Sequence, residues 1–507
     1  MSIHYDTLRK IAQEIITIPQ HFQLEMEDSI PIGDEKERAF VWEVPGTDEK
    51  IEICLDLNTG QLTRLEIERE QEEERKTDAM EKEIRAVTDP FLKKHAPNHA
   101  AYKWVEIEKQ NGIYHICYQE AVGGLPLPNT GCSFELDKEL QIIRYRLEEY
   151  HQPTERPTWP AQIVEKENVL QKIQSEMRTE LAFVTLWPSI YEIEGQESEE
   201  RLVYLPTPSH RWMDAVTGED LFGMDHYLMP PSAPIESKQE GQIDQHIDSI
   251  QQRADWEKRL GIDARQHTVW KSKDDGETLS FLYRQQGKDN DTEELEALSV
   301  EGYMKRKFGN MLRNLEASYM FQIEKSTGRL LGFSRGGEEE ERTPSFTRKK
   351  CWEKAESFLQ AVFPDFRSYL WLREDKEDTE DEAREVEFFY LPVYLNGVPV
   401  ESESVTIRVS TFTGEITWYN GVSYAKLCQL QTHSSTPVLT AEEALARYAE
   451  HLSVSLEWFH DLDVEPHTYR LVYKMSLGER SDGAEKKQRE LRYIDACSGE
   501  GIWNRKE

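Results

Sequence analysis

The stretch Asp-Ala-Val-Thr-Gly-Glu at residues 214–219 recurs as Asp-Ala-Cys-Ser-Gly-Glu at residues 495–500. Similar stretches lie at residues 56–62, 325–330 and 410–416, and a weaker copy without the glycine lies at residues 135–140. In such a stretch an Asp, Ser or Thr side chain can bond the turn backbone, and Gly adopts the positive φ that other residues resist. We therefore predict a tight turn between two strands at every copy.

A helical pattern precedes each of these turns. Residues 351–362 carry the strongest apolar stripe, and Thr440 and Glu443 have the spacing of a capping box at the start of another helix. The apolar spacing of residues 80–91 is also helical. Within that segment we expect Pro90 to break or restart the helix, because proline lacks the N–H donor.

Strand-like segments fill the interval between each helix and its turn. Residues 387–394 and 405–409, on either side of Asn396-Gly397, have the composition of strand, turn and strand. The repeating unit is thus a helix followed by a small antiparallel sheet, which makes the fold class α+β. One such unit buries little apolar surface alone, so we expect it to pack against a neighbour.

Longer matches show that the chain contains two copies of one block. Phe91-Leu92 is matched by Phe358-Leu359, and Arg201-Leu-Val-Tyr204 is matched by Arg470-Leu-Val-Tyr473. We predict a tandem array of six units arranged as two duplicated triplets. Their boundaries fall at residues 1–70, 71–151, 152–230, 236–337, 343–424 and 436–507.

The second copy carries an insert that the first copy lacks. Phe40 and Phe281 are equivalent positions, but Gly60 follows the first by 20 residues and Gly328 follows the second by 47. The insert, near residues 291–317, is helical in pattern and locally basic. Its candidate partner-docking residues are Lys305, Arg306, Lys307, Phe308, Met311 and Leu312. The alternatives are an internal contact with an acidic surface and a mobile amphipathic flap.

The overall composition indicates which classes of partner and which cellular compartment to expect. The 507 residues carry a formal net charge of -35, which disfavours binding to nucleic acid or to an anionic membrane surface. The 6 cysteines are widely spaced and show neither a disulfide framework nor a zinc-site spacing. No apolar run has the length of a membrane span, and no export signal is evident at the start. We expect a soluble protein of the cytoplasm without membrane insertion.

The turn stretches carry a resemblance to known modules. Residues 213–219 and 494–500 resemble PepSY-type modules, which are related to the propeptides of thermolysin-like metallopeptidases, and Tyr394-Leu-Asn-Gly-Val-Pro399 is similar to a further segment of those propeptides. The repeated combination is most similar to the YcdB/YcdC repeated-domain family, over nearly the whole chain. This resemblance implies PepSY-like helix-plus-sheet modules and a role in binding or restraining other proteins, peptidases among them. It brings no catalytic residues.

No arrangement of residues in the sequence demands a reaction or a cofactor. His95 and His99 have a metal-compatible spacing, but Pro97 between them disfavours the helix that such a site needs. No phosphate-binding loop, no Gly-x-Ser-x-Gly and no His-Glu-x-x-His motif is present. We therefore expect no metal, no cofactor and no catalytic residue.

These observations favour a non-catalytic protein that binds or regulates another protein or a peptide. A peptidase is one candidate target. The expected mechanism is the addition of a partner strand to an exposed sheet edge, in which main-chain hydrogen bonds supply affinity. One alternative is a structural or assembly protein. Another, which we rank lower, is an enzyme whose site lies between the two halves.

Overall fold

The computed structural model describes residues 3–31, 36–69, 79–148, 155–236, 253–285, 298–315, 319–336, 344–374, 384–464, 466–478 and 489–505, without the side chains of residues 308–315. Its α-helices are α1 (Tyr5–Ile15), α2 (Glu81–His95), α3 (Lys166–Glu176), α4 (Met224–Tyr227), α5 (Arg253–Arg259), α6 (Val300–Leu315), α7 (Arg348–Val362), α8 (Tyr424–Leu430) and α9 (Ala441–His451). Antiparallel sheets form the rest of the described secondary structure almost entirely, so the fold is α+β as predicted.

The first sheet comes wholly from residues 23–147. Its strands are β1 (Gln23–Ile30), β2 (Glu37–Glu43), β3 (Lys50–Asp56), β4 (Leu62–Glu68), β5 (Trp104–Gln110), β6 (Ile113–Gln119), β9 (Cys132–Leu136) and β10 (Ile142–Leu147). They lie in the antiparallel order β1-β2-β3-β4-β10-β9-β6-β5. A short hairpin of β7 (Ala121–Val122) and β8 (Leu125–Pro126) projects from this sheet. Helices α1 and α2 cover one face, and the buried residues of that face form a single core.

The second sheet begins with the same strand order. Its strands from the second half are β15 (His267–Asp274), β16 (Thr278–Gln285), β17 (Tyr319–Glu324), β18 (Leu330–Arg335), β20 (Val386–Leu395), β21 (Val398–Ser410) and β22 (Ile416–Asn420). The order β15-β16-β17-β18-β22-β21, with β20 on β21, matches β1-β2-β3-β4-β10-β9-β6 of the first sheet. A two-stranded pair of β14 (Ser232–Pro234) and β19 (Trp371–Arg373) lies beside it. The internal duplication read from the sequence is therefore visible in the topology.

The last segments of the two halves exchange strands. The remaining strands are β11 (Arg178–Leu186), β12 (Glu199–Thr207), β13 (Trp212–Asp214), β23 (Leu452–Asp461), β24 (Thr468–Leu477), β25 (Leu491–Asp495) and β26 (Gly501–Trp503). Hairpin β11-β12 pairs with β25 from the other half, while hairpin β23-β24 pairs with β13. The β11-β12-β25-β26 group extends the second sheet through one parallel contact, Phe183 with Val400. Helix α9 packs on β11 and β12, and α3 packs on β23.

Matching hydrogen bonds hold the exchanged strands. The Tyr204 hydroxyl donates to the carbonyl of Leu439 at 2.8 Å, and the equivalent Tyr473 hydroxyl donates to the carbonyl of Val164 at 2.9 Å. The backbone N–H groups of Ala215 and Ala496 donate across the exchange to Leu471 and Leu202, each at 2.9 Å. The repeated Arg-Leu-Val-Tyr segments therefore bind the turn of the opposite half, in a reciprocal arrangement within one chain.

The repeated stretches form the tight turns that we predicted. Gly60, Gly218, Gly328, Gly414 and Gly499 have φ between 67° and 77°. The carboxylate of Asp214 accepts from the backbone N–H of Thr217 at 2.8 Å, and the same pattern recurs at the other Asp-led turns. In the copy without glycine, Leu140 itself has φ 63°. The positive φ is thus kept in a turn that is one residue shorter, because the N–H of Leu140 bonds the carbonyl of Asp137, three residues earlier, whereas that of Gly60 bonds Asp56, four residues earlier.

The expectation that Pro90 breaks its helix is wrong. Helix α2 continues from Glu81 to His95 with Pro90 inside it. Proline removes the hydrogen bond to the carbonyl four residues earlier, which belongs to Ala86. Both Ala86 and Pro90 lie on the exposed side of α2, where solvent can satisfy that carbonyl, while Ile84, Thr88 and Leu92 anchor the opposite side.

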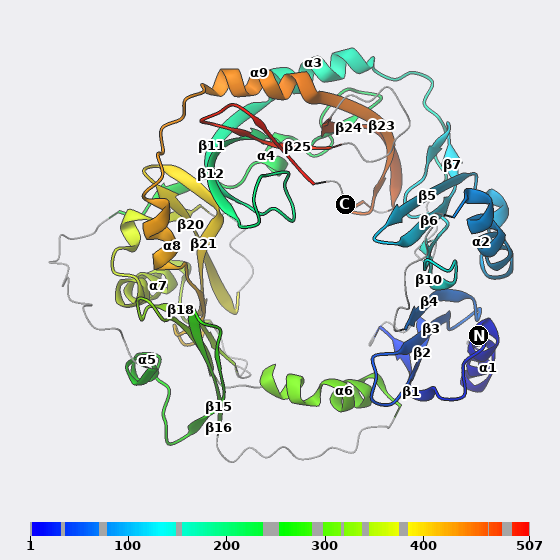
Figure 1. Ribbon diagram of the computed structural model, residues 1–507, viewed down its shortest axis with the longest axis horizontal. Coiled ribbons are helices and arrows are strands. Elements are labelled where there is room, and N and C mark those ends of the chain that lie inside the picture. The colour runs from blue at the N-terminus through cyan, green and yellow to red at the C-terminus, as the bar shows by residue number, and fades with distance from the viewer. Residues whose placement is uncertain are drawn as a thin grey trace.

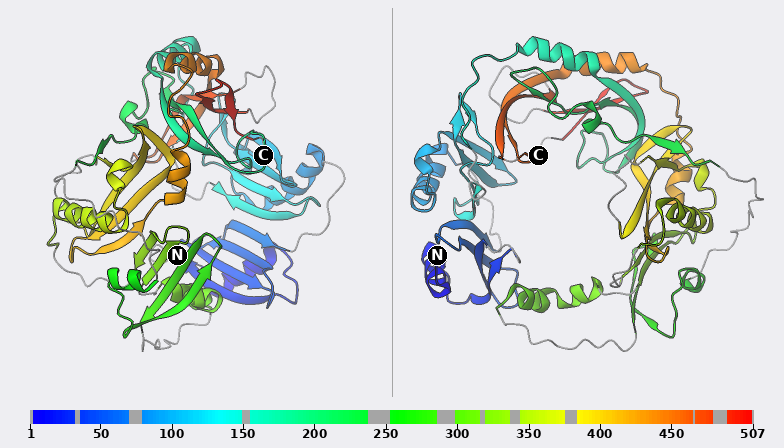
Figure 2. Two further views of the ribbon diagram at one scale, coloured as in Figure 1. Left: turned by 60° about the vertical axis from the view of Figure 1, so that its left-hand side comes forward. Right: turned by 180° about the vertical axis from the view of Figure 1, so that it is seen from behind.

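The elements follow one another around a ring, with most helices on its outer side (Figures 1 and 2). Helices α1 and α2 lie outside the first sheet and α7 lies outside the second, so the helix-free faces of both sheets turn inward. Helix α6 lies between β15-β16 and β1 and closes the ring (Figure 1). Among the described residues no helix combines the length and apolarity needed to cross a membrane.

Candidate interaction site

The helix-free faces of the two sheets can be compared residue by residue through strand register. Two adjacent rows of side chains cross each face. On the first sheet they are Met26, Val41, Glu52, Glu66, Arg144, Glu135 and His115, and beside them Asp28, Ala39, Cys54, Arg64, Arg146, Ser133 and Cys117. On the second sheet they are Lys271, Leu282, Met320, Ser334, Trp418, Arg408 and Phe388, and beside them Lys273, Ser280, Gln322, Gly332, Asn420, Thr406 and Tyr390.

Paired charges dominate the centre of the first face. Arg144 bonds Glu66 at 2.6 Å and Glu135 at 2.9 Å, and Arg64 pairs with Glu52 at 2.7 Å. Burial alone would raise the pKa of Glu66, but the hydrogen bond from Arg144 holds that pKa below its usual value. Glu66 is therefore held ionised within a ladder of ion pairs that also includes Glu52 and Glu135.

Helix α6 covers the β1-β2 end of the first face. Met26, Ala39, Val41 and Cys54 are buried there, and Val300 and Tyr303 of α6 pack against them together with Ile30. A backbone hydrogen bond also links β1 to the segment before α6, because the N–H of Glu27 donates to the carbonyl of Leu298 at 2.8 Å. The outer edge of β1 is thus occupied by the segment that leads into α6.

The cations of α6 bind acidic residues of the first sheet. Arg306 donates to the backbone carbonyl of Glu25 at 2.5 Å, and Lys307 pairs with Glu43. The Tyr303 hydroxyl donates to the same Glu43 carboxylate at 2.5 Å. Burial alone would lower the pKa of Lys307, but its hydrogen bonds to Glu43 and Tyr303 raise it. Lysine 307 therefore stays charged in this contact.

These contacts show where the described members of the predicted docking set lie relative to the first sheet. Arg306 and Lys307 contact the first sheet, as the alternative of an internal contact with acidic surface describes. Lys305 is exposed, as they are, but has no ion pair with that sheet among the described residues. Phe308, Met311 and Leu312 belong to the backbone of α6, and their side chains lie outside the described residues. Docking of a foreign partner by this helix stays a prediction.

The helix-free face of the second sheet consists of the two rows that begin with Lys271 and Lys273, and we call it the open face. It lies opposite α7, because Phe389 and Tyr419 turn toward Trp352 and Phe358 of that helix. Its central apolar side chains are solvent-exposed, with exposed fractions of 42% for Met320, 39% for Trp418 and 47% for Phe388. The register places these three in one row, together with Leu282. Large apolar side chains gathered on one surface are typical of an interaction site.

The charges of the open face are all positive. Lys271, Lys273 and Arg408 belong to its rows, and no residue of either row is a carboxylate. At its β15-β16 end, the Arg284 guanidinium stacks on the ring of Trp270 with 3.6 Å between them. In a chain with 96 acidic and 61 basic residues, this local excess of cations distinguishes the open face from the surface as a whole.

Sequence reasoning did not identify the open face. A local signal exists, because Phe388-Phe389 and Trp418-Tyr419 are adjacent aromatic pairs, and neighbours in a strand point to opposite faces. One aromatic of each pair must therefore lie away from the core. Their position in one row with Met320 depends on the register of strands that are up to 98 residues apart, from Met320 to Trp418. The sequence pattern alone does not give this register.

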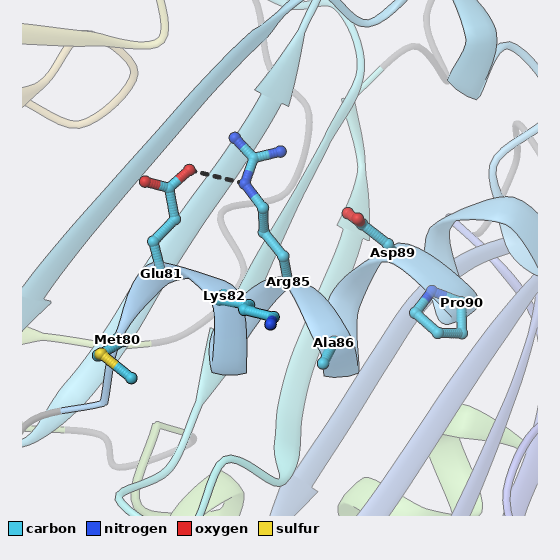
Figure 3. A pocket seen from close by; sticks show the side chains of 7 residues that line it. All are labelled: Met80, Glu81, Lys82, Arg85, Ala86, Asp89 and Pro90. Atoms are coloured by element: carbon cyan, nitrogen blue, oxygen red, sulfur yellow. Dashed lines mark hydrogen bonds and ion pairs between the residues drawn. The ribbon is translucent and has the colours of Figure 1, made fainter.

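A separate shallow hollow lies along the exposed side of α2 (Figure 3). It is lined by Met80, Glu81, Lys82, Arg85, Ala86, Asp89 and Pro90. Glu81 accepts from Arg85 at 2.7 Å, and Asp89 accepts from the Tyr118 hydroxyl at 2.7 Å. Its carboxylates are thus engaged in structural bonds, and the hollow brings together no nucleophile and base.

His95 and His99, whose spacing is compatible with a metal site, lie in different surroundings. His95 is buried against the ring of Phe91 at 4.4 Å, and His99 bonds the backbone carbonyl of Ala96 at 3.0 Å. Within the described ranges, no group of three or more His, Cys, Asp or Glu side chains is arranged to hold a metal ion.

Comparison with known proteins agrees with this architecture. A family model described as the YcdB, YcdC repeated domain matches residues 5–149 and 261–423. The first match ends after β10 and the second ends after β22, so each contains one complete copy of the shared strand order. The family resemblance seen in the sequence is thereby confirmed.

Two relatives match over nearly the full length. YcdB of Bacillus subtilis (strain 168) is 27% identical, with 98% of this chain and 97% of the relative covered. YcdC of the same organism is 24% identical, with 96% of this chain and 99% of the relative covered. Among solved structures, the Bacillus megaterium YpeB C-terminal domain aligns with 12% identity and a TM-score of 0.27, covering 43% of this chain and 96% of that one.

Proposed function

The chain belongs to the YcdB/YcdC repeated-domain family, and from that premise we propose that it is a non-catalytic binding protein whose open face takes up a segment of another protein. The single observation that carries the proposal is the row of exposed Met320, Trp418 and Phe388 on a face without carboxylates. Full burial of a large apolar side chain contributes roughly 1.5–3 kcal/mol. Covering the 39–47% of each of these three side chains that is exposed therefore contributes roughly 1 kcal/mol apiece.

The finer architecture of this proposal is an array of six PepSY-like modules in two triplets. The shared strand order of the two halves and the recurring turns with positive φ support it. The exchange between β11-β12 and β23-β24 joins the third and sixth modules into one body. A peptidase is one class of partner that the proposal includes, on the likeness of the turn segments to protease propeptides.

The route of binding that we now favour is contact with the open face. Strand addition needs a free edge, and the outer edge of β1 already bonds the segment before α6. The outer edge of β15 has no neighbouring strand among the described residues, and it borders the open face. A partner seated on the open face could therefore also reach this edge.

Affinity capture with matched variants tests the proposed function. The full chain and a Met320→Glu/Trp418→Glu double variant are used to capture proteins from a cell lysate, with Val438→Glu, at an exposed site before α9, as the control. We expect a protein that the wild type and the control retain and the double variant loses. If the wild type and the double variant capture the same proteins, the proposal is contradicted. If the wild type self-associates in light scattering and the double variant does not, the occupant is a second copy of the chain.

A further inference from the structure

Helix α6 shows how this kind of face is filled in the first half. The equivalence of Phe40 and Phe281 makes Val41 the counterpart of Leu282 and Glu43 the counterpart of Arg284. The register adds a second correspondence, because both edge strands have an irregularity at the same point: β1 between Leu24 and Met26, and β15 between Val269 and Lys271. The site of α6 therefore has a defined counterpart at the β15-β16 end of the open face.

The charges at the two equivalent places are opposite. Glu43, which binds Lys307 and Tyr303 of α6, is replaced by Arg284. Met26, beneath α6, is replaced by Lys271. A basic helix such as α6 would place its cations against Lys271 and Arg284, whereas carboxylates in the same places would form ion pairs.

The dimensions of the open face suit a helix of the length of α6. The row from Leu282 to Phe388 crosses from β16 to β20 and spans five strand spacings, about 24 Å at roughly 4.8 Å each. A helix of 16 residues, the length of α6, is also about 24 Å long. Residues at helical spacing on one side of such a helix can contact Leu282, Met320, Trp418 and Phe388 in turn.

We propose that the open face binds an amphipathic helix of a partner protein, about four turns long, with large apolar side chains on one side and Asp or Glu beside them. At the β15-β16 end this occupant takes the place equivalent to that of α6 with the charges reversed, and from there it continues along the row to β20. The inference rests on the proposed function and narrows it to one ligand chemistry.

Two synthetic peptides supply the probes. The acidic probe has the sequence of residues 298–317 with Lys305, Arg306, Lys307 and Arg313 each replaced by Glu, and the basic probe keeps the natural sequence. Both are titrated into the full-length protein, with tryptophan fluorescence and calorimetry as readouts. We expect the acidic probe to bind, to gain helical circular dichroism on binding, and to bind at least about tenfold more tightly than the basic probe.

Variants of the full chain locate the contact. Arg408→Glu and Arg284→Gln are expected to weaken the acidic probe about tenfold, and Trp418→Ser to weaken it similarly. The control is Lys354→Glu, an exposed position of α7 on the opposite side of the sheet, which changes the net charge as Arg408→Glu does. Thermal melts check that each variant is folded, as expected for Arg408 and Trp418, which are exposed, and for Arg284, which is half-buried.

The outcomes separate the inference from the proposed function. Equal binding of the two probes, an equal effect of Lys354→Glu, or binding without a gain of helix would overturn the acidic-helix inference. If, in that case, lysate capture still depends on Met320 and Trp418, the open face remains a binding surface with a different ligand. Acidic-probe binding that is unchanged by Trp418→Ser and Arg408→Glu would remove the open face as the site of the helix.

Discussion

At the scale of single residues, local chemistry determines the turns and not the contacts between distant strands. The glycine turns were predictable because the hydrogen bonds of the turn join residues three or four apart, as in Asp214 with Thr217. Leu140 shows the limit of residue preference, since it adopts φ 63° where glycine is absent. The course of α2 through Pro90 was not predictable, because it depends on which side of the helix the sheet covers.

His95 gives a prediction at the residue scale. Its side chain is 7% exposed, and burial, with a contribution from Lys94, lowers its pKa to about 4. The unfolded chain takes up the proton near pH 6.5, so the stabilisation from neutral His95 is complete above that pH and is lost as the pH falls toward 4. Between about pH 7 and about pH 5 this contributes roughly 2 kcal/mol to the loss of unfolding free energy.

Urea unfolding at the two pH values measures this contribution. His95→Gln removes the titrating group, so the variant should lose roughly 2 kcal/mol less than the wild type on acidification. The matched control is His99→Gln, because His99 lies four residues away and its ring is half-buried and hydrogen-bonded to the carbonyl of Ala96. An identical pH dependence in wild type and His95→Gln would show that His95 does not titrate in this way.

At the scale of elements, the exchange of strands was hidden by the duplication itself. Residues 201–204 and 470–473 have the same sequence, Arg-Leu-Val-Tyr, and each accepts the turn that follows the other. A strand that can pair equally well with two near-identical partners gives no local preference for its own half. The helix of the insert, by contrast, was predictable, because the apolar spacing that produces α6 lies within one segment.

The exchange predicts a long-range effect of a deletion. Removing residues 489–507 takes away β25 and β26, which leaves one edge of β12 without its partner strand. We expect backbone amides of residues 202–204 to exchange with deuterium about tenfold faster or more, although the deletion lies far away in sequence. Amides of β3 in the first sheet serve as the internal control and should be unchanged. Unaltered protection of β12 would contradict the observed pairing.

At the scale of the whole molecule, α6 connects the second half to the first sheet and conceals a thiol. Cys54 lies at 0% exposure within the cluster of residues that α6 covers, and burial raises the pKa of its thiol to about 12. Both effects should make Cys54 unreactive while α6 is docked. The thiol therefore reports whether the ring is closed.

Lys307→Glu should open this contact. The substitution replaces the pair with Glu43 by two like charges, which weakens docking by about 1–2 kcal/mol and raises the rate of maleimide labelling at Cys54 about tenfold. The measurement uses a background in which the exposed Cys428 and Cys497 are serine. Lys305→Glu is the control, because it makes the same change of charge on the same helix at a position without an ion pair to the first sheet among the described residues. Equal labelling in both variants would mean that the Lys307 contact does not hold α6.

The exchanged strands also set an order of events during synthesis. Hairpin β11-β12 is complete once Thr207 has left the ribosome, but the strand that borders it begins at Leu491. At about 5–20 residues per second, roughly 15–60 s of translation separate the two. Throughout that interval β12 lacks the strand that borders it in the native protein, and an unpaired strand edge is open to pairing with another chain.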